Sequence, residues 1–134
     1  MSYGGPRERD AFSEFLDLRF DSATVARLDI RPEIVNGVGK LLGPVVFALA
    51  DYGMGAAVWD TLDEGQVCAT VNVAINFIDS AASGEVVCTS RVDRRSRRAA
   101  ATSAELRHAD GRLLATAIGS FAVILGRTAP SPPA

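Results

Sequence analysis

One acidic side chain stands out as a group that could do chemistry. Asp51 is the only charged residue between Lys40 and Asp60, and the rest of this segment consists almost entirely of Val, Leu, Ala, Phe, Gly and Met. A carboxylate with apolar neighbours can activate water or attack an electrophilic carbon. It can equally lie on a solvated helix face or cap a local backbone group. The residues around Asp51 leave both interpretations open.

The other polar candidates have simple structural explanations of their own. Asn36 precedes Gly37 and so forms a common turn pair. Gly43 stands just before an apolar run, as loop glycines often do, and Thr70 lies in a strand-like stretch. The single histidine, His108, is next to a turn signal and belongs to no Cys/His cluster, so we expect no metal site.

Length and charge exclude several classes of protein. The chain has 134 residues, a net charge of −2 and a sequence pI near 5.3, which predicts one domain and no nucleic-acid partner. We place this domain at residues 10–126, between flexible ends at 1–9 and 127–134. The N-terminus lacks the apolar stretch of a signal peptide, and the run 41–59 is interrupted by Asp51, so we expect a cytoplasmic protein without a membrane span.

Hydrophobic periodicity predicts the elements that must position these groups. Helical spacing favours a short helix within residues 10–20, and a longer helix of about fifteen residues beginning near Pro44. Period-two patterns and turn signals favour five strands: 22–30 before the long helix, then 70–77, 85–94, 99–108 and 113–125 after it. In the first of the later strands, alternation places Thr70 on the other face of the sheet from Val71 and Val73. If those two residues pack on the helix, Thr70 could reach Asp51 only through a bulge.

The long helix is apolar on nearly every side, and a flat sheet could cover only one of its faces. A strongly curved antiparallel sheet of about five strands could wrap around it. The fold class is therefore α+β, with a central helix held by a curved sheet and an edge strand free to pair with a second copy.

At this point the chain resembles the acyl-CoA thioesterases of the hotdog fold, in their phenylacetate-degradation (PaaI-like) branch. That family has an Asn, then a His-Gly-Gly sequence, then a helix carrying an acid. Here Asn36 stands seven residues before Gly43, and Asp51 stands eight residues after it. Thr70 matches the Thr or Ser that opens the next strand. The resemblance covers residues 23–125 and departs from the pattern at the "LGP" sequence, 42–44, in place of His-Gly-Gly.

The resemblance implies a role for each matching residue. Asp51 would be the general base or the nucleophile, and the Gly43 N–H would polarise the thioester carbonyl. Asn36 would hold the acyl carbonyl or the water, and Thr70 would assist the water or the carboxylate. No metal or bound cofactor is implied, since coenzyme A belongs to the substrate.

These roles require more than one chain. Eight helical residues span about 12 Å, so one reacting carbon cannot lie within hydrogen-bond reach of Gly43 and Asp51 of the same helix. We therefore expect a homodimer, assembled further as a dimer of dimers, in which Gly43 of one chain meets Asp51 of another.

Two questions stay open at this level. Arg97 and Arg98, in the "RRSRR" hairpin tip, could bind the phosphates of coenzyme A or could simply be solvated. The change from His-Gly-Gly to "LGP" raises the alternative of a hotdog protein that binds acyl-CoA without cleaving it. Hotdog dehydratases use a His base near the helix, which this chain lacks.

The residues that could shape an acyl pocket are Val45, Phe47, Met54 and Trp59.

Overall fold

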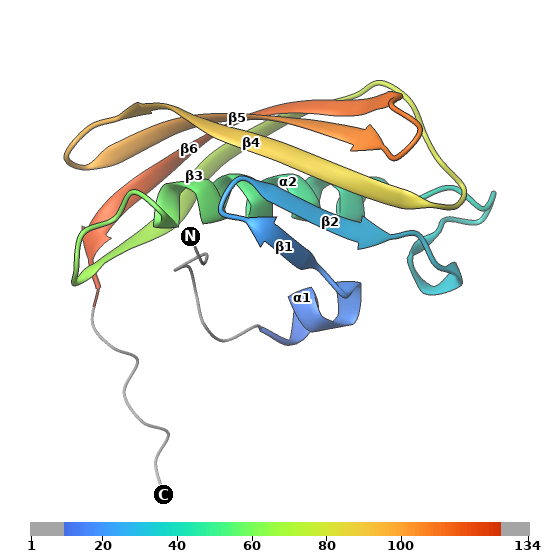
Figure 1. Cartoon of the computed structure of the whole chain (residues 1–134), viewed down its shortest axis with the longest axis horizontal. Helices are drawn as coiled ribbons and strands as arrows, with labels where there is room; N and C mark the ends of the chain where they lie inside the picture. Colours follow the sequence, from blue (N-terminus) through green and yellow to red (C-terminus); the bar gives the residue numbers. More distant parts are fainter. Residues whose placement is uncertain (1–9, 127–134) are drawn as a thin grey trace, which may run out of the picture.

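A six-stranded antiparallel sheet curves around one long helix (Figure 1). The computed structural model describes residues 10–126, so the two predicted flexible ends lie outside it. Its elements are α1 (Ala11–Leu16), β1 (Arg19–Ser22), β2 (Val25–Asp29), the 3-10 turn η1 (Pro32–Ile34), α2 (Gly43–Trp59), β3 (Gln66–Phe77), β4 (Glu85–Arg95), β5 (Ala99–His108) and β6 (Leu113–Leu125). The spatial order is β1-β2-β4-β5-β6-β3, which leaves β1 and β3 as the edges. The predicted hotdog architecture is confirmed.

The N-terminal region contains one strand more than the sequence indicated. The helix expected within residues 10–20 is only α1, which Asp10 caps by accepting a hydrogen bond from the Ser13 N–H at 2.8 Å. Asp17 then adopts a left-handed conformation (φ 51°) that ends the helix. The chain continues as β1, which pairs with β2 and gives the sheet six strands where about five were expected.

Helix α2 fills the concave side of the sheet and contacts β2 to β6. It starts after Leu42, whose extended backbone (φ −61°, ψ 133°) leads into Gly43, and Pro44 stands in its first turn, where a missing N–H costs little. Leu49, Met54 and Val58 are fully buried against the sheet. Small residues let the helix approach the strands closely, because they leave little between the two backbones.

Among the glycines of α2, Gly53 leaves the least room for a side chain. The Ser90 hydroxyl of β4 donates to the Gly53 carbonyl at 2.9 Å, and a Cβ added at Gly53 would lie 2.7 Å from the sulfur of the fully buried Cys88. Gly55, two residues on, has more room, since a Cβ there would lie 3.5 Å from the Phe121 ring.

We therefore expect Gly53→Ala and Gly55→Ala to have opposite effects on stability. Overpacking a filled core costs about 1–3 kcal/mol, and the helix propensity of Ala returns only about 1 kcal/mol, so Gly53→Ala should lower the free energy of unfolding. Gly55→Ala should leave it unchanged or raise it by up to about 1 kcal/mol. Urea denaturation of both variants measures the difference, and equal effects would contradict the packing at Cys88.

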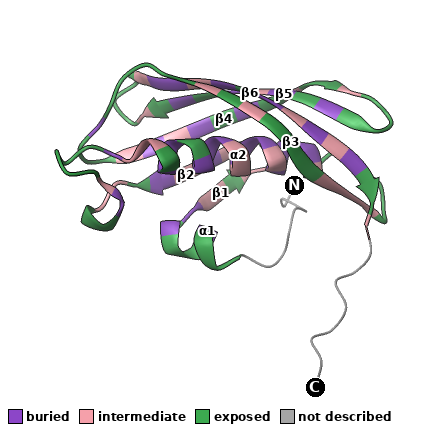
Figure 2. Cartoon of the chain, turned by 180° about the vertical axis from the view of Figure 1, so that it is seen from behind, coloured by how far each residue is buried: buried purple, intermediate pink, exposed green. Residues whose placement is uncertain are grey.

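The edge strand β3 contains the bulge that the sequence required of Thr70. Thr70 pairs with Phe121 and Asn72 pairs with Ser120, so Val71 is an extra residue in the ladder. Val71 is 67% exposed, and the register of β3 against β6 shifts by one residue here, so the residues on either side of Val71 exchange faces. Exposed and half-buried residues run along β3, as Figure 2 shows. The strict alternation predicted for residues 70–77 is therefore wrong at its first step.

Candidate active site

The bulge turns Thr70 toward Asp51. The Thr70 hydroxyl donates to Oδ1 of Asp51 at 2.8 Å, which joins β3 to the middle of α2. Asp51 is half-buried, and within residues 10–126 no hydrogen bond reaches its second oxygen, Oδ2. One carboxylate oxygen is therefore oriented by the strand, and the other is available to accept a proton.

Two titratable side chains that feel the Asp51 charge, Cys68 and Tyr52, do not compete with Asp51 for this role. Burial, with a smaller contribution from the Asp51 charge, raises the pKa of the Cys68 thiol to about 11. Burial also raises the pKa of Tyr52 to about 12, together with the hydrogen bonds of its hydroxyl to both Asp10 oxygens at 2.8 and 2.9 Å. Both groups stay protonated at neutral pH, so neither supplies a nucleophilic anion there.

Gly43 carries the one free donor in the first turn of α2. Pro44 has no N–H, and the N–H groups of Val45 and Val46 both donate to the Leu42 carbonyl, at 3.0 and 3.1 Å. The Gly43 N–H has no acceptor anywhere in residues 10–126. It therefore projects from the positive end of a 17-residue helix, where developing negative charge on an oxygen is stabilised.

Asn36 has the structural role of a turn residue, and it retains a free donor. Its Oδ1 accepts from the N–H groups of Val38 and Lys40, each at 3.0 Å, and its backbone closes the same turn. Because both partners are donors, the oxygen must face them, and the amide Nδ2 points the other way. In the described residues Nδ2 has no hydrogen-bond partner, so Asn36 could donate to a ligand.

Within a single chain these four residues do not converge. Asp51 and Thr70 are in contact, but no hydrogen bond in the described chain joins either of them to Gly43 or Asn36. Gly43 and Asp51 share the Phe47 face of α2, at steps of four residues, and are about 12 Å apart along the axis.

The space beside this face is an apolar hollow of about 440 Å³ between α2 and β3. It is lined by Gly43, Pro44, Phe47, Ile75 and Phe77. Of the residues expected to shape a pocket, only Phe47 lines it, because Val45 and Met54 are buried in the core and Trp59 lies at the far end of the helix. Sequence reasoning gave no pocket role to Phe77.

The Arg97 and Arg98 side chains lie at the exposed β4–β5 hairpin tip. Neither makes an ion pair with any residue that the structure describes. Their neighbour Arg95 is instead held by the Thr61 hydroxyl and the Gln66 side chain, each at 3.1 Å. Arg97 and Arg98 thus lie near the C-terminal end of α2, because their neighbour Arg95 bonds to Thr61, two residues beyond Trp59.

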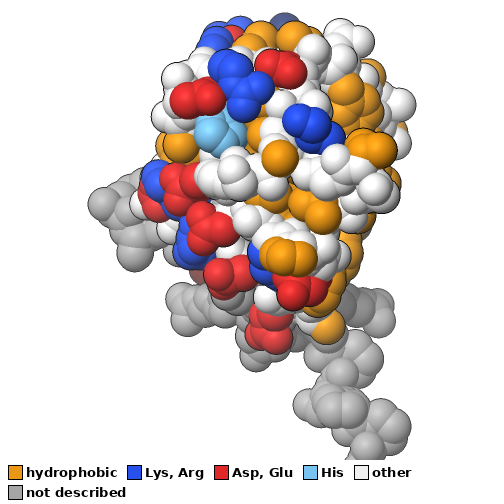
Figure 3. Space-filling view, turned by 90° about the vertical axis from the view of Figure 1, so that its right-hand side faces the viewer, with side chains coloured by type: hydrophobic (Ala, Val, Ile, Leu, Met, Phe, Trp, Pro, Cys, Tyr) orange, Lys and Arg blue, Asp and Glu red, His pale blue; other side chains and the backbone are white. Residues whose placement is uncertain are grey.

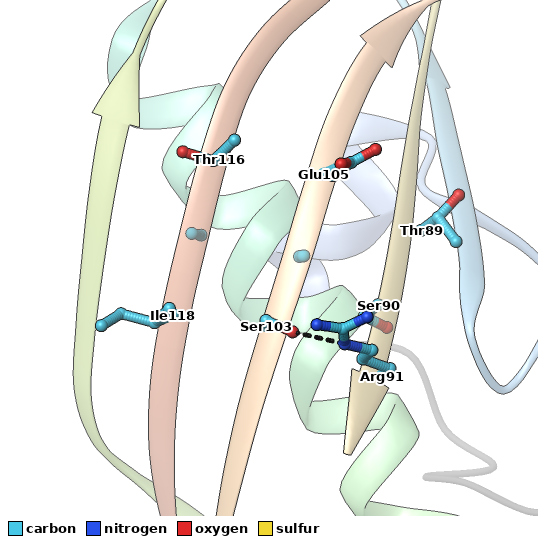
Figure 4. Close-up of a pocket in the computed structure, with 9 residues that line it drawn as sticks. Thr89, Ser90, Arg91, Ser103, Glu105, Thr116 and Ile118 are labelled. Carbon is cyan, nitrogen blue, oxygen red and sulfur yellow. Dashed lines mark hydrogen bonds between the residues drawn. The ribbon is translucent and has the colours of Figure 1, made fainter. Parts of the chain in front are cut away.

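A second cavity, of about 450 Å³, lies on the outer face of the sheet over β4, β5 and β6 (Figure 4). Within it Arg91 donates to the Ser103 hydroxyl at 3.0 Å, and it also donates to Asp93, outside the cavity lining, at 2.7 Å. The helix and Asp51 are on the opposite face, so this cavity takes no part in the candidate site.

His108 is likewise engaged in local structure, bonding to the Ser83 carbonyl at 2.8 Å and lying 3.1 Å from Asp110. No group of three potential metal ligands occurs in residues 10–126. Over the same residues, no helix has the length and apolar character to cross a membrane.

Comparisons with known proteins agree with this fold. The sequence model of the thioesterase superfamily matches residues 38–115. A conserved protein of Pseudomonas aeruginosa is 30% identical over 89% of this chain and 100% of its own, with a TM-score of 0.78. A phenylacetic acid degradation-related protein of Ralstonia eutropha is 26% identical over 88% of this chain and 93% of its own, with a TM-score of 0.77.

A Bacillus halodurans protein crystallised with CoA has a TM-score of 0.83 at 20% identity, over 88% of this chain and 78% of its own. At that identity the likeness concerns the fold. No curated protein matches the chain. The family match spans more than half of the sequence and includes Gly43, Asp51 and Thr70, whereas Asn36 lies just before it. The chain belongs to the thioesterase superfamily, and it is a thioester hydrolase of the hotdog fold.

Proposed function

We propose that the protein hydrolyses acyl-CoA thioesters in a site shared by two chains. The observation that carries the proposal is the pairing of one free helix N–H, at Gly43, with one strand-oriented carboxylate, Asp51, on the same open face of α2. Thioester hydrolysis needs both an oxyanion donor and a base or nucleophile. The fit of these groups to that chemistry supports the assignment.

The free edge of β3 supports the proposed dimer. A second copy that pairs with this edge about a two-fold axis near Phe47 runs its helix antiparallel to the first. Gly43 then faces the partner's Asp51 across the apolar hollow. The exposed apolar side chains of Phe47 and Phe77 and the unpaired strand edge are surfaces that such a copy would cover. We propose a homodimer, two of which assemble as the expected dimer of dimers. A measurement of the molar mass in solution tests both assemblies.

In this site the reaction proceeds through a tetrahedral intermediate. Asp51 takes a proton from water, the water oxygen attacks the carbonyl carbon, and the carbonyl oxygen becomes an anion that the Gly43 N–H stabilises. Collapse breaks the C–S bond, and the proton held by Asp51 passes to the CoA thiolate. Asn36 would donate from Nδ2 to the acyl carbonyl, and Thr70 would hold Asp51 in place.

Asp51 could instead attack the carbon directly and form an anhydride that water then opens. A single turnover in ¹⁸O-labelled water separates the two routes, because only the anhydride route can leave label in the Asp51 side chain. Arg97 and Arg98 would bind the CoA phosphates, since guanidinium groups without ion-pair partners suit phosphate oxygens. We expect the reaction in the cytoplasm, where acyl-CoA is made and used.

A second candidate function is acyl-CoA binding without hydrolysis. The observation that favours it is the "LGP" start of α2, where Leu42 and Pro44 stand in place of the His and second Gly of the family pattern. We expect turnover, because the Gly43 N–H is free despite both changes.

The test is an assay of the purified protein against aryl- and fatty-acyl-CoA thioesters, with Asp51→Asn as the control. Release of free CoA by the wild type but not by the variant supports the thioesterase. If acyl-CoA raises the melting temperature of the wild type while no thioester is cleaved, the binding function replaces it.

A further inference from the structure

A second, smaller hollow lies on the other side of Gly43. It has a volume of about 200 Å³ and is lined by Leu41, Gly43, Val46, Phe77, Asp79, Ser80, Ala81 and Leu114. Its floor is apolar and closed, since Leu41, Val46, Ala81 and Leu114 are each no more than 7% exposed. We call it the inner hollow, and the 440 Å³ space beside Phe47 the outer hollow.

Only Gly43 and Phe77 line both hollows. The Phe77 ring lies against Gly43, because a Cβ at that glycine would be 3.6 Å from two of its ring carbons. The ring therefore forms the partition between the two spaces, directly beside the N–H that would bind the thioester oxygen.

The other walls of the inner hollow are fixed by hydrogen bonds. The Leu41 N–H donates to the Ala81 carbonyl at 2.8 Å, and the Asp79 N–H donates to the Leu114 carbonyl at 3.1 Å. Arg112 closes the far rim by donating to the Asp79 carboxylate at 3.0 Å and to the Ser80 carbonyl at 3.1 Å. Figure 3 looks onto the side of the molecule that faces right in Figure 1, and shows most of its charged side chains toward the left and centre and hydrophobic ones along the right edge.

Phe77 differs from these walls because it closes the hollow with a side chain, which is 56% exposed in the single chain, and not with hydrogen-bonded backbone. A wall made of one side chain changes when that residue is substituted, whereas a wall tied by backbone hydrogen bonds keeps its place. The partition is therefore the part of the cavity that a substitution can open.

The inner hollow is large enough to hold part of a substrate. An apolar cavity of about 150 Å³ accepts a molecule of benzene, so about 200 Å³ accepts a group of at least six carbons. The floor offers that group only apolar contacts, and the charged rim at Asp79 marks the limit of its depth.

We propose that Phe77 sets the length of acyl group that the site accepts, by closing the inner hollow behind Gly43. The inference rests on the proposed acyl-CoA hydrolysis and adds a specificity-determining residue to it. With the ring against Gly43, the acyl group is confined to the outer hollow. When the ring is removed, the two spaces join and the end of a longer chain enters the inner hollow.

The experiment compares kcat/KM for straight-chain acyl-CoA substrates from four to twelve carbons in the wild type and in Phe77→Ala, Phe77→Leu and Phe77→Trp. We expect Phe77→Ala to raise the twelve-to-four-carbon ratio by at least about tenfold, since one methylene in an apolar pocket changes kcat/KM by about 10- to 200-fold. Phe77→Leu should give a ratio between those of the wild type and Phe77→Ala, and Phe77→Trp should lower the ratio below that of the wild type. A ratio that stays within about twofold across the series would overturn the proposal.

Val71→Ala is the matched control, because Val71 is an exposed apolar residue of the same strand that lines neither hollow. It should leave the ratio unchanged. Adding Ala81→Val to Phe77→Ala refills the inner hollow and should reverse the gain for long chains. Melting temperature and molar mass are measured for every variant, and Phe77→Leu keeps an apolar cover on β3 if Phe77→Ala disturbs assembly.

Non-hydrolysable S-alkyl-CoA thioethers separate this inference from the proposed function. If the wild type cleaves no thioester but the Phe77 variants change the chain-length dependence of thioether affinity, hydrolysis fails and the role of Phe77 stands. If thioesters are cleaved and neither the kinetic nor the binding preference responds to Phe77, the role of Phe77 fails alone.

Discussion

Replacing Asp51 by asparagine is expected to lower kcat by about 10³-fold while leaving the fold intact. General base catalysis by a positioned side chain contributes about 10²- to 10⁴-fold, and an amide cannot take the proton. The variant should fold, because the Asn side-chain oxygen can still accept the hydrogen bond that Thr70 donates to Asp51. The measurement is the release of free CoA under saturating substrate, with circular dichroism to verify the fold.

Two further substitutions show whether the effect belongs to the site. Asp60→Asn removes an exposed carboxylate at the C-terminal end of the same helix and should leave kcat unchanged. Thr70→Val removes the hydroxyl and should lower kcat by about 10- to 100-fold, since a hydrogen bond to a charged group contributes about 1.5–3 kcal/mol. Full activity in Asp51→Asn would remove Asp51 from the mechanism.

Two inactive variants should restore activity when they are combined. Gly43→Pro removes the free N–H, and Leu42 already has the extended backbone that a residue before proline adopts. Alone it should lose about 10²- to 10³-fold in kcat, as expected for an oxyanion donor. Mixed with Asp51→Asn, it forms heterodimers in which the intact Gly43 of one chain faces the intact Asp51 of the other.

Random association should return about a quarter of the wild-type activity, because roughly half of the dimers are mixed and each holds one intact site of two. The two variants are mixed, partly unfolded and refolded together, so that they exchange subunits. The rate of CoA release is then measured as a function of the ratio of the two variants. Gly43→Ala serves as the control, since it keeps the N–H and its Cβ meets Phe77 at an ordinary 3.6 Å. Activity that stays at the level of the single variants would place both groups in one chain and contradict the shared site.

The order of the elements could be predicted because its signals are local. The alternation in β4, β5 and β6 and the turn residues between them reproduce the observed strands to within a residue or two. The long helix was recognisable from its apolar run and from Pro44 at its start. Asp51 was conspicuous for the same reason, since a lone charge in such a run is visible without any knowledge of the fold.

The N-terminal strand and the bulge depend on partners that are distant in the sequence. Residues 19–22 have helical spacing with α1, but they form β1 because β2 offers them a ladder. Thr70 reaches Asp51 only because Val71 is left out of the pairing between β3 and β6. Alternation can be read from one strand alone. A bulge is an extra residue in one strand relative to its partner, so it is defined only by the pairing of the two strands.

The sequence by itself determined the class of fold, the succession of helix and strands, and the presence of one acid in the central helix, because each is written in the spacing of neighbouring residues. Only the tertiary structure decided that the Gly43 N–H has no acceptor, that the Asn36 oxygen is occupied while its Nδ2 is free, and that Phe77 divides one cavity into two. These properties are relations between groups far apart in the chain, and packing sets them through the distances and contacts that it imposes.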